Sequence, residues 1–183
     1  MIDKSDRDRL LECFAWRGDR TDDSSYADVT GWWRTPAVLS DLGRLLGRLF
    51  ADVSPTVVLG VEARGFILGP LVAVTLGVSF VEVRKDPEQL SDSDAWLRRT
   101  TPPDYRDRQL TLGFRRDLVH GSDRVLLVDD WIDTGGQALG VHRLVEAAGA
   151  TWLGVATVVD ALESNEVRRR LNVRSLLHMR DLR

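Results

Sequence analysis

Short apolar runs alternate along this chain with segments in which apolar residues recur every three or four positions. The runs predict buried strands, and the recurring positions predict amphipathic helices. Strands are expected at 56–61, 79–84, 109–114, 125–128, 152–159 and 173–179. Helices are expected at 5–16, 36–53, 66–76, 136–148 and 164–171. Because strands and helices alternate, the pattern favours an α/β fold with a parallel sheet covered on both faces.

Local signals support several of these boundaries. Thr35 and Pro36 are typical of a helix N-cap and first helical residue, Ser164 of an N-cap, and Gly149 of the position after a helix end. Residues 86–108 are polar, contain three prolines and show little periodicity. Loops of this length inside compact domains are often lids, so we expect a lid here, with part of it pairing with strand 109–114.

Composition limits the classes of function. A chain of 183 residues has the size of one domain, and its net charge of −3 argues against nucleic acid as a partner. The lone Cys13 fits a reducing, cytoplasmic location. The long apolar stretch 66–83 is interrupted by Pro70, Gly77 and Glu82, so we expect no membrane span, and the mostly charged first nine residues argue against a secretory signal.

The segment after the apolar run 125–128 carries the clearest chemistry. Thr134, Gly135, Gly136 and Gln137 form a predicted turn that opens a helix. The free N–H groups at a helix start attract a phosphate, and glycines let the backbone wrap closely around the anion. The turn therefore predicts a phosphate-binding site at the sheet edge where open α/β folds bind ligands.

Asp129 and Asp130 lie between the strand and the turn. Ionised carboxylates only accept hydrogen bonds, which suits the two hydroxyls of a ribose or a hydrated Mg²⁺. The alternative is an ordinary strand, turn and helix in which the acidic pair only caps the helix. The segment is neither a Walker A loop nor a dinucleotide fingerprint.

Residues 125–137 resemble the phosphoribosyl pyrophosphate (PRPP) motif of the type I phosphoribosyltransferases. Residues 58–69 resemble the diphosphate loop of the adenine enzymes, 81–85 resemble the basic strand end that follows it, and 26–30 resemble an aromatic-x-Asp-Ile-Thr element. The four matches occur in the family's order and span roughly residues 26–160.

The resemblance implies a Rossmann-like parallel core with a small hood from residues 1–34 and 160–183, and a lid at 86–108. It also implies Mg²⁺ as cofactor, PRPP and a nucleobase as partners, and a homodimer. Mg²⁺ would be held mainly by PRPP, with Asp129 and Asp130 in its second shell. The PRPP-binding residues would be Glu62, Ala63, Arg64, Gly65, Arg84, Lys85, Asp129, Asp130, Asp133, Thr134, Gly135, Gly136 and Gln137.

Arg64, Lys85 and Asp133 are the expected catalytic residues. Arg64 can clamp a diphosphate with its planar guanidinium, and the alternative is a surface arginine in a salt bridge. Asp133 stands where adenine enzymes usually carry alanine, and it resembles the aspartate of hypoxanthine–guanine enzymes that faces the purine imidazole. It can act as general base or acid, or interact favourably with the helix dipole.

The base is expected to contact Trp131, Ile132, Asp133 and Val159. Gln137 departs towards the xanthine enzymes, and the lid lacks the acid expected in adenine enzymes, so the motif does not identify the base. The first hypothesis is a purine phosphoribosyltransferase. The alternatives are a non-catalytic PRPP-sensing regulator and a transferase for an unusual base.

Overall fold

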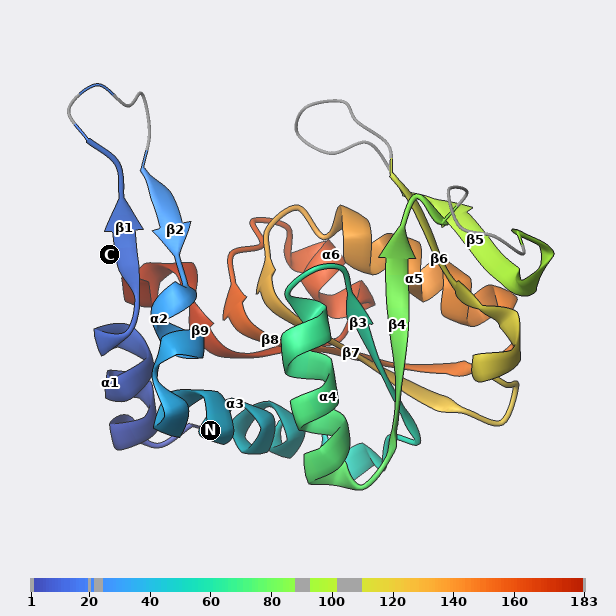
Figure 1. The fold of residues 1–183 in the computed structure, drawn as a ribbon, viewed down its shortest axis with the longest axis horizontal. Helices are drawn as coiled ribbons and strands as arrows, with labels where there is room; N and C mark the ends of the chain where they lie inside the picture. Colours follow the sequence, from blue (N-terminus) through green and yellow to red (C-terminus); the bar gives the residue numbers. More distant parts are fainter. Residues whose placement is uncertain (1, 20, 22–24, 88–92, 102–109, 183) are drawn as a thin grey trace.

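The computed structural model describes residues 2–19, 21, 25–87, 93–101 and 110–182. Its central sheet has the strand order β5-β6-β4-β3-β7-β8-β9 (Figure 1). Five neighbouring strands are parallel to one another, namely β4, β3, β7, β8 and β9. Strand β6 is antiparallel to both β4 and β5, and β5 and β6 form one edge of the sheet. Their bounds are β3 Val57–Val61, β4 Ser79–Lys85, β5 Trp96–Thr100, β6 Thr111–Arg115, β7 Arg124–Ile132, β8 Thr151–Asp160 and β9 Val173–His178.

Helices cover both faces of this sheet. Helices α3 (Pro36–Arg48) and α4 (Gly65–Leu76) pack with alternate residues of the central strands, for example Val58 and Leu126. Helix α5 (Gly136–Ala147) packs on the other face with Leu59 and Leu127. The two buried clusters alternate along the same strands, as a sheet covered on both sides requires. The predicted α/β architecture is confirmed.

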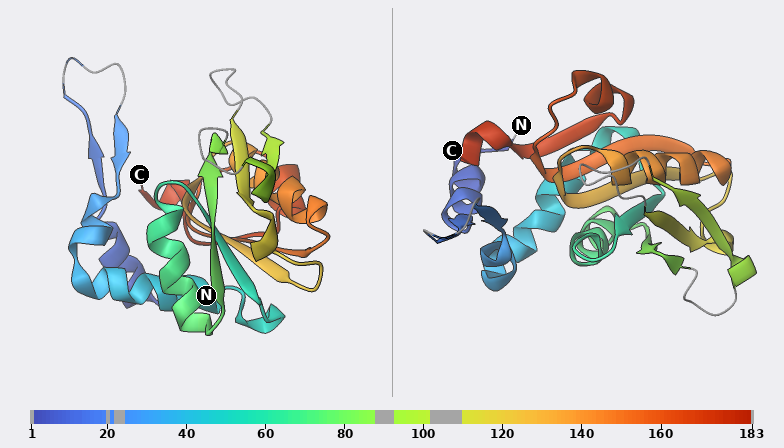
Figure 2. Two further views of the ribbon diagram at one scale, coloured as in Figure 1. Left: turned by 45° about the vertical axis from the view of Figure 1, so that its right-hand side comes forward. Right: turned by 90° about the horizontal axis from the view of Figure 1, so that it is seen from above.

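A smaller N-terminal part lies beside the sheet and contains α1 (Lys4–Glu12), a hairpin of β1 (Ala15–Arg17) with β2 (Tyr26–Asp28), and α2 (Thr30–Arg34). The last turn of the chain, η5 (Met179–Leu182), packs against it, and Figure 2 shows both chain ends at this side of the molecule. The Trp16 indole N–H donates to the Leu182 carbonyl at 2.8 Å, and Arg7 pairs with Asp181 at 3.1 Å.

Several boundaries differ from the sequence prediction. The first helix ends at Glu12, because the chain turns into β1 instead of continuing to residue 16. Helix α3 ends at Arg48, and a separate 3₁₀ turn, η1 (Ala51–Val53), follows. The predicted caps are otherwise informative: the Ser164 hydroxyl accepts from the Val167 N–H to begin α6 (Asn165–Arg170), and Gly149 has a φ of +75° after α5.

The expected lid falls partly outside the described residues, which omit 88–92 and 102–109. Within the part of that segment that the structure describes, β5 pairs with β6 over residues 96–100. The expected pairing of this segment with the strand near residue 110 is therefore confirmed.

Candidate active site

Strand β7 is longer than the apolar run that predicts it. Its pairing with β3 ends at Val128, opposite Gly60, whereas its pairing with β8 continues to Ile132, opposite Asp160. The prediction that the strand ends before Asp129 is therefore wrong. The reason is that β8 supplies ladder partners for Asp129, Trp131 and Ile132, which the apolar pattern does not reveal. Asp129 and Asp130 project beyond β3 while remaining held by β8.

The phosphate-binding turn has the expected form. Gly135 has a φ of +79°, where glycine carries no steric penalty, and α5 begins at Gly136. A methyl group on Gly135 would lie 2.7 Å from Val167 Cγ1, so the site also lacks room for a larger residue. The Thr134 hydroxyl accepts from the Gly136 N–H at 3.4 Å. The turn thus presents the start of α5 to the solvent side.

A cavity of about 850 Å³ lies at this turn. Asp129, Trp131 and Asp133 from β7 and its end line it, together with the turn and with Lys85 from the end of β4. Its volume is in the range typical of small-molecule sites. The complete lining is Lys85, Leu110, Leu127, Asp129, Trp131, Ile132, Asp133, Thr134, Gly135, Gly136, Gln137, Ala138 and Val155.

The two adjacent carboxylates have different environments. Asp130 is 5% exposed and accepts from the Arg64 guanidinium at 2.7 Å. Burial raises the pKa of the Asp129 carboxyl well above its usual range, and the neighbouring Asp130 charge raises it further, while Lys85 opposes the shift. A ligand that brings hydrogen-bond donors or a cation to Asp129 would reverse this penalty.

The loop at residues 62–65 begins α4 beside the carboxyl end of β7. It approaches the sheet closely because Gly60 and Gly65 have no side chains: a methyl on Gly60 would lie 2.2 Å from the Gly65 carbonyl oxygen. The Glu62–Ala63 peptide bond is cis. Arg64 is half-exposed, and its ion pair with Asp130 joins this loop to the acidic pair. The alternative of a salt-bridged arginine is thus realised in the structure, and neither Arg64 nor Asp130 is among the residues that line the cavity.

The two basic residues at the end of β4, Arg84 and Lys85, have different surroundings. Lys85 lines the cavity, and its backbone N–H donates to Glu62 at 3.1 Å. Arg84 instead pairs with Glu82 at 2.9 Å and lies over the Phe66 ring at 5.0 Å from its centroid. Glu82, and to a smaller extent Glu62, raise the pKa of the Arg84 guanidinium. Arg84 is therefore held near the loop, outside the cavity lining.

Three of the four residues expected to contact the base line the cavity, and one does not. Trp131, Ile132 and Asp133 line the cavity, and Asp133 is exposed. Val159 is fully buried in the core and does not line it. The sequence did not indicate that Leu110 and Val155 join the lining. Nor did it reveal that Phe14 stacks on Trp131 at 6.4 Å and that Trp16 meets it edge-on at 6.5 Å.

In the described residues, no helix is long and apolar enough to span a membrane. Within the same residues, no group of three or more His, Cys, Asp or Glu side chains is arranged to hold a metal ion.

Known proteins are similar to this chain in sequence and in architecture. The chain is 38% identical over 158 residues to the adenine phosphoribosyltransferase of Methylococcus capsulatus, covering 84% of this chain and 88% of that one. It is 36% identical over 138 residues to the enzyme of the same name from Parasynechococcus marenigrum, covering 74% and 76%.

Solved structures agree with these matches. The adenine phosphoribosyltransferase of Rhodothermus marinus superimposes with a TM-score of 0.81 at 30% identity, covering 97% of this chain and 100% of that one. The Trypanosoma brucei enzyme, crystallised with AMP, pyrophosphate and ribose-5-phosphate, gives 0.78 at 26% identity, covering 99% and 83%. The family model of the phosphoribosyl transferase domain matches residues 33–178. The chain therefore belongs to the phosphoribosyl transferase domain family.

Proposed function

We propose that this protein transfers the 5-phosphoribosyl group of PRPP to a purine base and releases diphosphate. The observation that carries the proposal is a single cavity in which a phosphate-binding turn, Asp129, Lys85 and the exposed Asp133 meet. Adenine is the first base to consider, because the relatives named above are adenine phosphoribosyltransferases.

Each part of PRPP has a chemically matched partner. The 5′-phosphate binds the turn Thr134–Gln137, where helix N–H groups and a positive dipole end favour an anion. The ribose hydroxyls donate to Asp129 and Asp130. Opening of the Arg64–Asp130 pair frees the guanidinium for the diphosphate, with Lys85 and the backbone of the loop at 62–65 as further partners.

Mg²⁺ fits this set of hard oxygen groups. It would be held mainly by PRPP oxygens, with Asp129 and Asp130 in the second shell, and it would neutralise charge on the leaving diphosphate. The raised pKa of Asp129 supports a role for incoming cations or donors, because either favours the ionised carboxylate.

In the transfer, a ring nitrogen of the base forms a bond to C1 of the ribose while the bond from C1 to the diphosphate oxygen breaks. The base loses the proton from its imidazole ring, and Asp133 is placed to accept it. Positioning of the two reactants and compensation of the diphosphate charge supply most of the rate enhancement.

The remaining expectations complete the proposal. The N-terminal part and η5 form a hood over the base side, supported by their mutual contacts and by the stacking of Phe14 on Trp131. The segment 86–108 serves as the lid. The family resemblance further suggests a homodimer in the cytoplasm.

Replacement of Asp133 by asparagine tests the catalytic assignment. The variant should lose about 10²- to 10⁴-fold in kcat, the usual contribution of a positioned acid or base, while calorimetry shows unchanged PRPP affinity. Asp117→Asn, at an exposed carboxylate in a 3₁₀ turn, is the matched control. Full turnover in the Asp133 variant would remove this residue from the mechanism.

A further inference from the structure

A second cavity adjoins the first. It has a volume of about 600 Å³ and lies beyond the carboxyl ends of β8 and β9. Asp133 lines both cavities. The second cavity is therefore placed next to the residue that faces the reacting nitrogen in the proposed function. Its lining is Asp133, Asp160, Ala161, Leu162, Glu163, Arg168, His178, Met179 and Arg180.

The floor of this second cavity is a fixed polar network centred on Asp160. The Asp160 carboxylate is 3% exposed and accepts from Arg168 at 2.6 Å and from the Leu162 N–H at 3.0 Å. The Asp160 contact raises the pKa of the Arg168 guanidinium. A buried carboxylate with several partners is held in one orientation.

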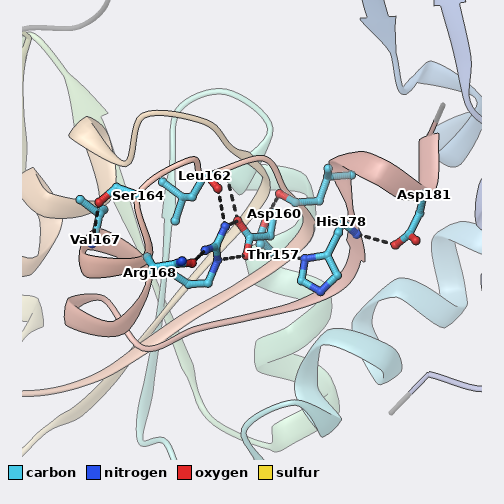
Figure 3. A network of polar contacts seen from close by, with 10 residues as sticks. Thr157, Asp160, Leu162, Ser164, Val167, Arg168, His178 and Asp181 are labelled. Carbon is cyan, nitrogen blue, oxygen red and sulfur yellow. Dashed lines mark hydrogen bonds and ion pairs between the residues drawn. The ribbon is translucent and has the colours of Figure 1, made fainter.

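His178 is the remaining neighbour of this carboxylate. Figure 3 shows Arg168 and His178 on opposite sides of Asp160, with the second ring nitrogen of His178 directed away from it. The His178 Nδ1 lies 3.8 Å from Asp160 Oδ2, and the side chain is 48% exposed at the cavity. In the neutral imidazole, one ring nitrogen donates and the other accepts, and a carboxylate beside Nδ1 favours the tautomer in which Nε2 is the acceptor.

We propose that the second cavity receives the edge of the purine remote from the ribose, and that His178 Nε2 accepts a hydrogen bond from an exocyclic amino group of the base. This inference rests on the proposed function. Asp133 meets the imidazole side of the base, and the six-membered ring extends into the second cavity.

The arrangement selects between bases. An amino group at position 6 donates to Nε2, whereas an oxo group places two acceptors against each other. Sites built to hydrogen-bond one substituent discriminate strongly, because the wrong partner leaves polar groups unpaired. His178 is thus a specificity residue, and Asp160 and Arg168 act through it as positioning residues.

Calorimetry with AMP, IMP and ribose 5-phosphate tests this inference without requiring turnover. The unaltered protein should bind AMP more tightly than IMP. His178→Ala should weaken AMP binding at least about tenfold, remove the preference over IMP, and leave ribose 5-phosphate binding unchanged. His120→Ala, at an exposed position before β7, is the matched control and should retain the preference.

The outcomes separate the inference from the proposed function. Unchanged AMP affinity and selectivity in His178→Ala would overturn the assignment of the second cavity while ribose 5-phosphate binding still supports the first. Absence of binding of all three ligands to the unaltered protein would contradict the proposed function itself. Equal loss of AMP and ribose 5-phosphate binding in the variant would show a general structural effect and would also overturn the inference.

Discussion

Asp129 and Asp130 are neighbours in sequence, yet their carboxylates have different environments in the free protein. Arg64 pairs with Asp130, whereas burial and the Asp130 charge raise the pKa of Asp129. The ionised form of such a carboxylate is unfavourable until a ligand brings donors or a cation to it. Groups of this kind are common in functional sites.

The isosteric change Asp129→Asn should therefore stabilise the ligand-free protein at pH 7. A carboxyl whose pKa is raised on folding contributes stability at low pH and loses it as the pH rises above 3.8, its usual value. Asparagine has no such dependence. Urea unfolding should show a higher midpoint for the variant at pH 7 and a smaller gain as the pH falls towards 3.8.

The same variant should lose PRPP affinity, because it replaces the carboxylate proposed to accept from a ribose hydroxyl. A control is Asp117→Asn, which should change neither property. A destabilised Asp129→Asn protein, or one with a pH-independent effect, would contradict the account of this carboxyl.

At the residue scale, the sequence predicted which residues form the site better than it predicted which distant residues contact them. The turn residues and Asp129 follow from local chemistry and from the resemblance of residues 125–137 to a known motif. The stacking of Phe14 on Trp131 joins residues far apart in the chain. Such contacts depend on the packing of the two chain ends, which leaves no local pattern.

At the scale of elements, the contact of β3 with the start of α4 positions the loop at residues 62–65. Gly60→Ala would place a methyl 2.2 Å from the Gly65 carbonyl oxygen and 3.1 Å from Phe80. We expect a loss of about 1–3 kcal/mol in the free energy of unfolding, typical of overpacking, and weaker PRPP binding.

Gly121→Ala provides the control for this change. The nearest atom to its added methyl is the Gly149 carbonyl oxygen at 3.6 Å, an ordinary contact. Both proteins should be compared by urea unfolding and by PRPP calorimetry. Equal stability of the two variants would show that β3 and α4 tolerate a wider separation.

The junction of β2 with α2 carries an acid-sensitive contact. Asp28 accepts from the Thr30 N–H at 2.9 Å and from its hydroxyl at 2.5 Å, and these bonds with the Arg17 contact lower the Asp28 pKa to about 2. A depressed carboxyl pKa gives stability that is present above 3.8 and lost as the pH falls through about 2.

Asp28→Asn should accordingly reduce the acid sensitivity of the protein. Thermal unfolding between pH 4 and pH 2 should show a smaller fall in Tm for the variant than for the unaltered chain, because asparagine does not titrate. Identical falls in Tm would place the acid-sensitive groups elsewhere. Asp94→Asn, at an exposed residue of η3 (Ser93–Ala95), is a suitable control.

Elements with strong periodicity or a continuous apolar run were predictable, whereas short or paired ones were not. Helix α4 and strand β3 follow from their apolar residues. The hairpin of β1 and β2 has only three residues in each strand, too few to show alternation. Beyond Val128, the ladder partners of β7 lie in β8, so the strand character of this end is a property of the sheet and not of the local sequence.

At the scale of the whole molecule, the sheet order brings the β3–α4 loop and the β7–α5 turn to adjacent strands, with the end of β4 next to β3. The carboxyl ends of these parallel strands meet at one edge, where α/β folds bind ligands. The alternation of elements predicted the parallel core. The antiparallel arrangement of β5 and β6 was harder to predict from the sequence, because sheet order depends on long-range pairing.

The most direct test of the central proposal combines the protein with Mg²⁺, PRPP and a panel of bases, and identifies products by mass spectrometry. The panel contains adenine, hypoxanthine, guanine, xanthine, orotate and uracil. The account predicts a nucleoside monophosphate from a purine, with diphosphate released in equal amount, and no nucleotide without PRPP. Binding of PRPP without nucleotide formation from any purine would contradict the assignment as a purine phosphoribosyltransferase.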